Sequence, residues 1–414
     1  MALPAAIGAR YAVRPLAPPA TEALSAALAH VGGGIDTLPE IARHGAAEAL
    51  AVRGLEADES RILEREAERA GCHVLLSRDG GRAVLLGPLS AVAALPQRLM
   101  DFGRRSEGLG QAVAAALMGR SRGVRLVPAG RFTLETGHRS LVMGIVNVTP
   151  DSFSGDGLDP DQAVARGRAL AAAGADLIDV GGESTRPHSA EVPEGEEMER
   201  VIPVIRELCA SLPVPVCVDT RKAAVAAAAL EAGADGVNDI WGLTGDAAMA
   251  GVLAGYPRTM VVAMHNRRGT TGGPDVVEDV CVGLWRSLEA AEAAGIDPDR
   301  VVVDPGFGFG KTPGQNLELV RRLGELRGIG RPLLLGASRK STIGLLAAGG
   351  GGPPAAEERL AGSLALAVMG VAAGADLVRV HDVAETVQAL RVADALVYGT
   401  PSALAAAPAP GPTQ

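Results

Sequence analysis

Three segments of this sequence share one pattern, in which a helix ends at a glycine and a strand follows at once. They read AAAGADLIDV at 171–180, LEAGADGVNDI at 230–240 and VAAGADLVRV at 371–380. In each segment the glycine stands just after the helix, where a left-handed backbone is favoured, and apolar residues typical of a strand come next. Repeated units of this kind predict alternating helices and strands around a parallel sheet.

The chain from about residue 141 onward contains eight strand-like apolar runs separated by segments able to form helices. The strand-like runs are 141–147, 176–182, 214–220, 235–240, 259–265, 300–306, 332–338 and 377–382. The clearest helical segments are 160–174, 221–233, 280–295 and 358–374. Eight parallel strands that each lead into a helix predict a (β/α)₈ TIM barrel, because an open doubly wound sheet usually has fewer units.

The length of 414 residues favours about two domains. Residues 1–120 read as strand, helix, hairpin and helix, which predicts a smaller N-terminal α/β accessory domain of unassigned role. We expect a linker at 121–129, the barrel at 130–398 and a disordered Pro/Ala tail at 399–414. Residues 131–140 predict a hairpin, with its turn at 135–138, that closes the bottom of the barrel.

Composition narrows the class of function. The formal net charge of -9 argues against a nucleic-acid partner, because phosphate binding over a broad face needs a basic surplus. The four cysteines lack metal-ligand spacing and are expected to be buried free thiols, which suits a reducing compartment. The start of the chain lacks the order of a signal peptide, and no apolar run is long enough to span a bilayer. We therefore expect a cytoplasmic protein without membrane contact.

Polar residues stand at or just beyond the end of every predicted barrel strand. They are Asn147, Glu183, Asp219, Asn238, Asp239, His265, Asp304, Ser338, Lys340, Arg379, His381 and Asp382. A single Asp after a strand is most often a helix N-cap. The carboxyl ends of barrel strands meet on one face, however, so polar ends on all eight strands predict a shared pocket there.

Part of this polar set suits an anion. The segments 144–157 and 179–189, here called loop one and loop two, contribute hydroxyls and backbone amides, and loop two adds Arg186. Such groups together can hold a phosphate. Arg379 and His381 are two residues apart on one strand, so they share a face and predict a second clamp for the same anion.

The other part suits a flat ring. Its members are Asp219, Asn238, Asp304 and Lys340. A buried carboxylate can accept two parallel N–H bonds, so this mixed set of donors and acceptors fits a heterocycle that carries an amino-pyrimidine edge. The predicted pocket therefore holds a ring at one end and an anion at the other.

The motifs that carry these residues resemble the dihydropteroate synthase family over roughly residues 130–398. In order they are MGIVNVTPDSFS, DVGGESTRP, VCVDT, VNDIWG, MHNR, DPGFGFGKTPGQNLE, GASRKS and RVHDV. The resemblance implies a transferase of folate biosynthesis that joins 6-hydroxymethyl-7,8-dihydropterin diphosphate to 4-aminobenzoate and releases diphosphate. It also implies a Mg²⁺ cofactor and a homodimer.

The resemblance implies a role for each matching residue. The pterin would be bound by Asp219, Asn238, Asp304 and Lys340, with Met264 lining its pocket. The diphosphate would be held by Asn147, Arg379 and His381, with Asn147 also next to Mg²⁺. The aminobenzoate would be framed by Thr185, Arg186, Pro187, Phe309, Ser338 and Lys340. The implied catalytic residues are Asn147, Arg379, His381 and Lys340.

The sequence departs from the family pattern at a few positions. Loop one reads SFSGDG where the family usually has an Asp and two glycines, His188 replaces a common glycine, and Arg221 replaces a frequent aromatic residue. Three other interpretations stay open. A methyltetrahydrofolate-binding methyltransferase also grips a pterin, a Schiff-base aldolase would use Lys340, and a non-catalytic pterin-binding paralogue could act through residues 1–120.

Overall fold

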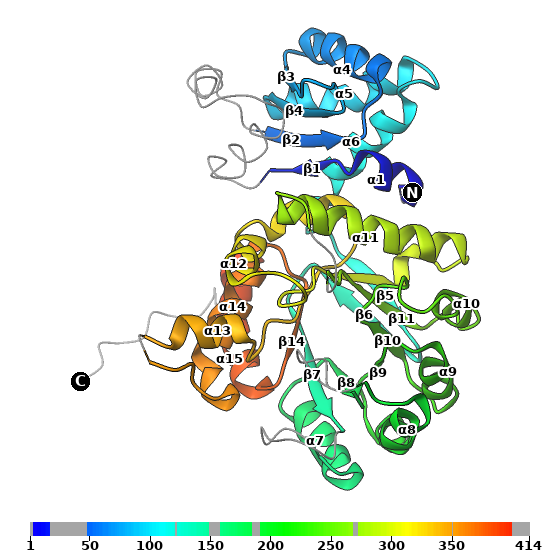
Figure 1. Ribbon diagram of the computed structural model, residues 1–414, viewed down its shortest axis with the longest axis vertical. Helices are drawn as coiled ribbons and strands as arrows, with labels where there is room; N and C mark the ends of the chain where they lie inside the picture. The colour runs from blue at the N-terminus through cyan, green and yellow to red at the C-terminus, as the bar shows by residue number, and fades with distance from the viewer. Residues whose placement is uncertain are drawn as a thin grey trace.

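A computed structural model describes residues 3–16, 48–120, 122–148, 158–183, 191–267, 272–349 and 351–399. Figure 1 shows a small N-terminal domain above a barrel, with helix α11 lying between the two. Nowhere in the described ranges is a helix both long and apolar enough to cross a bilayer. The predicted tail at 399–414 lies outside the described residues apart from Gly399.

The barrel contains the eight predicted strands, all parallel. They are β7 (Leu141–Asn147), β8 (Leu177–Gly181), β9 (Val216–Asp219), β10 (Gly236–Asp239), β11 (Met260–Met264), β12 (Val301–Asp304), β13 (Leu334–Leu335) and β14 (Leu377–Val380). Their order is β12-β11-β10-β9-β8-β7-β14-β13. A bridge between Val303 and Leu333 joins the two ends of this order, so the predicted TIM barrel is confirmed.

Helices surround this sheet (Figure 1). They are α7 (Pro160–Ala172), α8 (Glu194–Ser211), α9 (Ala223–Glu231), α10 (Met249–Ala254), α11 (Val276–Ala293), α12 (Pro313–Arg321), α13 (Ser341–Ala347), α14 (Leu360–Ala373) and α15 (Val383–Val397). Successive strand residues face opposite sides. Val180 and Val218 pack in the large core beneath the helices, whereas Leu177, Cys217 and Val262 pack in a second core inside the barrel.

The three repeated helix-to-strand units are built alike. Gly174, Gly233 and Gly374 follow their helices with φ of +101°, +106° and +129°, as the pattern predicts. The Asp two positions later accepts a hydrogen bond from the neighbouring strand: Val142 N to Asp176 at 2.8 Å, Val216 N to Asp235 at 3.1 Å and Leu333 N to Asp376 at 2.9 Å. Each unit thus stops a helix and also ties two strands together at the base of the barrel.

The hairpin before the barrel differs from the prediction. Strands β5 (Arg125–Ala129) and β6 (Phe132–Thr136) pair around a turn at Gly130, so the turn at 135–138 and the linker at 121–129 are wrong. Gly130 has φ +57° and donates its N–H to the carbonyl of Arg258, and Arg131 pairs with Asp235. These distant partners set the turn. The hairpin does close the base of the barrel, because Val127, Ala129 and Leu134 join the inner core.

The N-terminal domain has the predicted order of strand, helix, hairpin and helix. These elements are β2 (Glu48–Arg53), α4 (Ala57–Ala70), β3 (His73–Leu76), β4 (Arg82–Gly87) and α5 (Leu89–Asp101). The structure adds α1 (Ala5–Tyr11), β1 (Arg14–Pro15) and α6 (Glu107–Gly119). The sheet is antiparallel in the order β1-β2-β4-β3, and its own core lies against α4, α5 and α6.

Helix α1 connects this domain to the barrel. Gly8 lies so close to the ring of Trp285 on α11 that an added Cβ would stand 2.3 Å from a ring carbon. The backbone N–H of Ala5 donates to Glu292, also on α11, at 2.6 Å. The first residues of the chain therefore belong to the packing of both parts. All four cysteines are free and buried, as predicted.

Candidate active site

The strand ends bring most of the predicted site residues to one mouth of the barrel. Asn147, Asp219, Met264 and Asp304 are the last residues of β7, β9, β11 and β12, and Asn238 and Arg379 lie in β10 and β14. On four of these strands the residue two positions earlier belongs to the inner core; these residues are Cys217, Val262, Val302 and Leu377. Every second side chain of a strand points to the same side of the sheet. The inward-pointing side chains are therefore apolar within the barrel and polar at its mouth.

Arg379 stands at the centre of the site floor. Its Nε donates to Asp179 at 2.6 Å and its Nη2 donates to Asp219 at 2.6 Å. Asn238 donates from Nδ2 to the same Asp179 oxygen at 2.9 Å. The ring-binding set and the anion-binding set predicted from the sequence therefore meet directly at this floor.

Burial decides the electrostatics of this floor. It raises the pKa of the Asp219 carboxyl to about 7, and the attraction of Arg379 opposes that rise. Burial alone would lower the pKa of Arg379, but Asp179 and Asp219 together raise it above its ordinary value. The guanidinium accordingly stays charged, and Asp219 is the group of the pair whose charge responds to pH near neutrality.

Asp304 supplies a third carboxylate at the floor. It is 5% exposed, and one of its oxygens accepts the backbone N–H of Gly306 at 2.7 Å. Burial raises its pKa, while nearby Lys340 is the strongest influence in the opposite direction. A buried carboxylate with a cation nearby can accept N–H groups of a ring.

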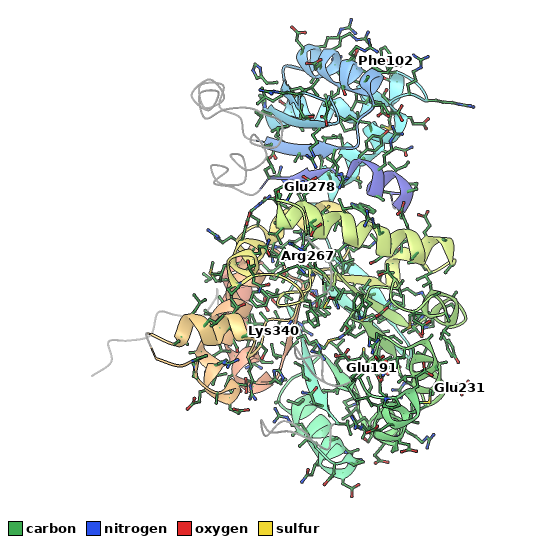
Figure 2. The ribbon with its side chains drawn as sticks, viewed as in Figure 1. Phe102, Glu191, Glu231, Arg267, Glu278 and Lys340 are labelled. Atoms are coloured by element: carbon green, nitrogen blue, oxygen red, sulfur yellow. The ribbon has the colours of Figure 1, made fainter. Side chains whose placement is uncertain are left out.

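An apolar wall lies at the ends of β10 and β11 and in the loop after β12. Met264, Ile240 and Phe309 are buried and pack together, with Trp241 against them. The Nζ of Lys340, labelled in Figure 2, lies 4.5 Å from the centroid of the Phe309 ring and donates to the carbonyl of Phe307. The wall is apolar and has the cation of Lys340 against it, which suits a planar heterocycle.

Ser338 and His381 form the remaining side of the mouth. The Nδ1 of His381 is 3.0 Å from the Ser338 hydroxyl, and the backbone N–H of His381 donates to that hydroxyl at 3.3 Å. Asn147 is the last residue of β7. It is paired with Gly181 of β8, and Gly181 is paired in turn with Asp219 of β9. The predicted diphosphate residues thus surround the floor, although two N–H groups of Arg379 are already committed to carboxylates.

The predicted aminobenzoate residues Thr185, Arg186 and Pro187 lie outside the described residues, as do 149–157 of loop one. Other polar strand ends have structural partners. Asp239 accepts the backbone N–H groups of Trp241 and Leu243, so it stabilises a turn. Asp382 pairs with Arg339. For these residues the simpler interpretation, a polar group that caps backbone or pairs locally, is correct.

Two functional candidates were not identified from the sequence. Asp179 is fully buried and holds Arg379, and its other oxygen has no hydrogen-bond partner among the described residues. Lys311 is 8% exposed and donates to the carbonyls of Gly306, Phe309 and His265. The inward register of β8 is the signal that could have identified Asp179.

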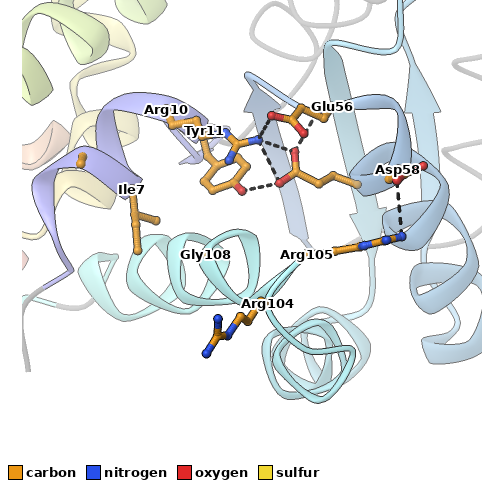
Figure 3. Close-up of a pocket in the computed structure, with 10 residues that line it drawn as sticks. Ile7, Arg10, Tyr11, Glu56, Asp58, Arg104, Arg105 and Gly108 are labelled. Carbon is orange, nitrogen blue, oxygen red and sulfur yellow. Dashed lines mark hydrogen bonds and ion pairs between the residues drawn. The ribbon is translucent and has the colours of Figure 1, made fainter.

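A pocket in the N-terminal domain offers a different place for a ligand (Figure 3). It lies between α1 and the starts of α4 and α6 and contains none of the predicted site residues. Its charged groups are largely matched internally, since Arg10 pairs with Glu56 and Glu59 and Arg105 lies 3.6 Å from Asp58. The chemistry predicted from the motifs therefore belongs to the barrel mouth.

Comparison with known proteins agrees with this site. Residues 143–381 match the pterin-binding enzyme family, and they include every site residue placed above. The chain belongs to this family. A dihydropteroate synthase of Clostridium beijerinckii is 44% identical over 271 residues, which cover 65% of this chain and 98% of the relative.

Solved structures give the same result. The Xanthomonas albilineans dihydropteroate synthase with 4-aminobenzoic acid is 42% identical with a TM-score of 0.62, covering 69% of this chain and 100% of that one. The Burkholderia cenocepacia enzyme complexed with 7,8-dihydropteroate is 43% identical with a TM-score of 0.59, covering 66% and 97%. About a third of this chain has no counterpart in these relatives.

Proposed function

We propose that this pterin-binding enzyme is a dihydropteroate synthase, which condenses 6-hydroxymethyl-7,8-dihydropterin diphosphate with 4-aminobenzoate to give 7,8-dihydropteroate and diphosphate. The observation that carries the proposal is the contact of Arg379 with Asp179 and Asp219, beside Asn238. This contact places carboxylates that can bind a ring next to a fixed cation at the mouth of the barrel. A methyltransferase or an aldolase would not need this pairing.

The reaction needs positioning and charge stabilisation more than a strong base. The amine nitrogen of aminobenzoate attacks the methylene carbon of the pterin, the bond from that carbon to the diphosphate oxygen breaks with its electron pair leaving on the diphosphate, and the amine proton passes to the released diphosphate or to water. The departing diphosphate gains charge as its bond stretches, so the cations Arg379 and Lys340, together with His381, whose ring can donate a hydrogen bond, would lower the barrier. Asp219, Asn238 and Asp304 would hold the ring in line for the attack.

A magnesium ion is also part of the proposal. No three His, Cys, Asp or Glu side chains within the described ranges are grouped as a protein-built metal site would require. Mg²⁺ is usually held by one or two protein oxygens together with substrate phosphates and water, so the amide oxygen of Asn147 fits this pattern. When bound, the ion would neutralise charge on the diphosphate.

Turnover by the purified chain with both substrates tests the function directly, with release of diphosphate as the readout. Replacing Arg379 with Ala should lower kcat/KM by an amount that corresponds to about 2–4 kcal/mol of transition-state stabilisation. The control is Arg168→Ala, because Arg168 forms an exposed pair with Glu207 on the outer helices. Undiminished turnover of Arg379→Ala would contradict the role of the cation, and no turnover by the unmodified chain would contradict the function.

The same proposal includes a cytoplasmic homodimer that binds neither nucleic acid nor membrane. Exposed apolar side chains on adjacent barrel helices support self-association, namely Met369 on α14 and Val392 and Leu396 on α15. Contiguous exposed apolar groups commonly mark protein interfaces. Sedimentation equilibrium of the full chain should give twice the monomer mass, and Leu396→Glu should shift the mass toward the monomer.

A further inference from the structure

Three backbone carbonyls at the barrel mouth surround the buried amine of Lys311. Its Nζ lies 2.9 Å from the carbonyl oxygen of Gly306, 3.2 Å from that of Phe309 and 3.3 Å from that of His265. An ammonium has three N–H groups to donate. A neutral amine has two N–H groups and a lone pair. The three carbonyls therefore match the charged form of Lys311 fully, and one of them would face a lone pair in the neutral form.

These carbonyls belong to the segments that carry the apolar wall and one floor carboxylate. Phe309 packs in the wall, and His265 directly follows Met264, another member of the wall. Gly306 donates its backbone N–H to Asp304 at 2.7 Å. One amine thus spans the end of β11 and the loop after β12, and it sets the spacing between them.

We propose that Lys311 is a positioning residue for the pterin ring, and that it holds the apolar wall in its binding geometry only while its amine is charged. The inference rests on the proposed function for the identity of the ring. In the charged form, three hydrogen bonds fix both segments before the ring arrives. In the neutral form one carbonyl loses its donor, so the ligand has to supply part of this ordering and its affinity falls.

The charge of this amine changes near neutral pH. Burial is the main cause that lowers the pKa of Lys311 to about 7. The charged groups that act on it are Asp304, Lys340, Arg267 and Asp279. The two carboxylates oppose the lowering of the pKa, and the two cations add to it. The side chain of His265 stays neutral in this range, because burial lowers the pKa of its imidazole to about 3. The contribution of Lys311 to ring binding should therefore be present below about pH 7 and decline above it.

Equilibrium binding of 6-hydroxymethylpterin to the full chain tests this inference without turnover, by isothermal titration calorimetry. Lys311→Met keeps an unbranched side chain but has no N–H group, so the dissociation constant should rise about tenfold at pH 6. At pH 9 the rise should be only about threefold, because the unmodified chain then donates two N–H groups instead of three. Lys311→Gln has two N–H groups at every pH. It should bind the pterin more weakly than the unmodified chain at pH 6 and about equally at pH 9.

The dissociation constants are compared between proteins at the same pH, because Asp219, with a pKa of about 7, also changes charge in this range. Arg300→Met is the matched control. Arg300 is buried just before β12, where its guanidinium donates to three carbonyls between residues 253 and 259. It holds carbonyls as Lys311 does, but at the opposite ends of β11 and β12. Its replacement should leave the pterin dissociation constant unchanged at both pH values.

The outcomes separate the inference from the proposed function. A loss of affinity in Lys311→Met that is the same at pH 6 and pH 9, or an equal loss in Arg300→Met, would overturn the inference. Circular dichroism at each pH shows whether a variant is folded. If Lys311→Met does not fold, the comparison of Lys311→Gln with the unmodified chain decides the same question. Absence of pterin binding by the unmodified chain would count against the proposed function instead.

Discussion

Lys311 keeps an amine in a part of the barrel mouth that little water reaches. Its Nζ donates to the carbonyls of Gly306 at 2.9 Å, Phe309 at 3.2 Å and His265 at 3.3 Å, so it joins the end of β11 to the loop after β12. Burial is the main cause that lowers the pKa of Lys311 to about 7, and Asp304 opposes this change. The charge of this one side chain, which contacts the loop beside the ring-binding wall, therefore changes with pH near neutrality.

The pKa of Lys311 predicts a pH-dependent stability. An unfolded lysine titrates near pH 10.4, so between about pH 7 and pH 10 the unfolded chain retains a proton that the folded chain has released. The free energy of unfolding should therefore rise with pH across this window, by at most about 1.4 kcal/mol per pH unit for one proton. Lys311→Met should lack this increment, as urea unfolding at several pH values would measure. Parallel curves for the two proteins would contradict the prediction.

Asp179 shows the limit of residue-level prediction. The rule that strand ends meet at one mouth predicted the place of Asp219 and Asn238, which are paired in register on adjacent strands, and of Asp304 at the end of β12. Asp179 lies inside β8, between Ile178 and Val180, and its partner Arg379 is 200 positions away. Nothing local in the sequence specifies that pairing, since it depends on how the barrel closes.

The loop between β12 and α12 depends on glycine at one closely packed point. Gly306 has φ +69°, and a Cβ at this position would stand 2.0 Å from the carbonyl oxygen of His265. A side chain would thus meet both an unfavourable backbone conformation and a backbone clash. The approach of this loop to β11 also brings Phe309 against Met264.

Gly306→Ala should therefore destabilise the fold by about 2–3 kcal/mol and raise the KM for the pterin diphosphate. Gly314→Ala is the matched control, because Gly314 lies in α12 with open space around it. That change should be neutral or stabilising by up to about 1 kcal/mol. Urea unfolding and initial rates measure both quantities. A Gly306→Ala protein as stable as the control would show that the loop can move without cost.

The order of helices and strands was largely predictable from the sequence, whereas the position of the turn before the barrel was not. The local sequence shows where helices end, at Gly174, Gly233 and Gly374. Alternating helices and strands can therefore be predicted from it. The turn at Gly130 is set instead by Arg258 and Asp235, which come from other parts of the barrel. Local turn signals at 135–138 therefore gave the wrong position.

At the scale of the whole molecule, a buried charge cluster fastens the N-terminal domain to the barrel. Arg14, which is 2% exposed, pairs with Asp275 at 2.8 Å and Glu325 at 3.0 Å. Arg322 contacts both of the same carboxylates. Asp275 is also the N-cap of α11, where it accepts the N–H groups of Val277 and Glu278. A residue outside the segment that matches the family thus stabilises the start of a helix inside that segment.

This cluster predicts that the two parts of the chain unfold together. Arg14→Met leaves Asp275 and Glu325 buried with Arg322 as their remaining close cation, and breaking a buried pair in this way typically costs about 3–5 kcal/mol. Arg61→Met is the control, because its pair with Asp58 on α4 is well exposed and should contribute less than about 1 kcal/mol.

The two tryptophans make the test specific, since Trp241 and Trp285 both lie in the barrel and Trp285 packs against Gly8 of α1. Tryptophan fluorescence therefore follows the barrel and its junction, while far-ultraviolet circular dichroism follows the whole chain. In the unmodified chain both signals should change in one transition, and Arg14→Met should move both to lower urea. If only the dichroism shifted and the fluorescence midpoint stayed in place, the barrel would not depend on Arg14 for its stability. That result would contradict the prediction that the two parts unfold together.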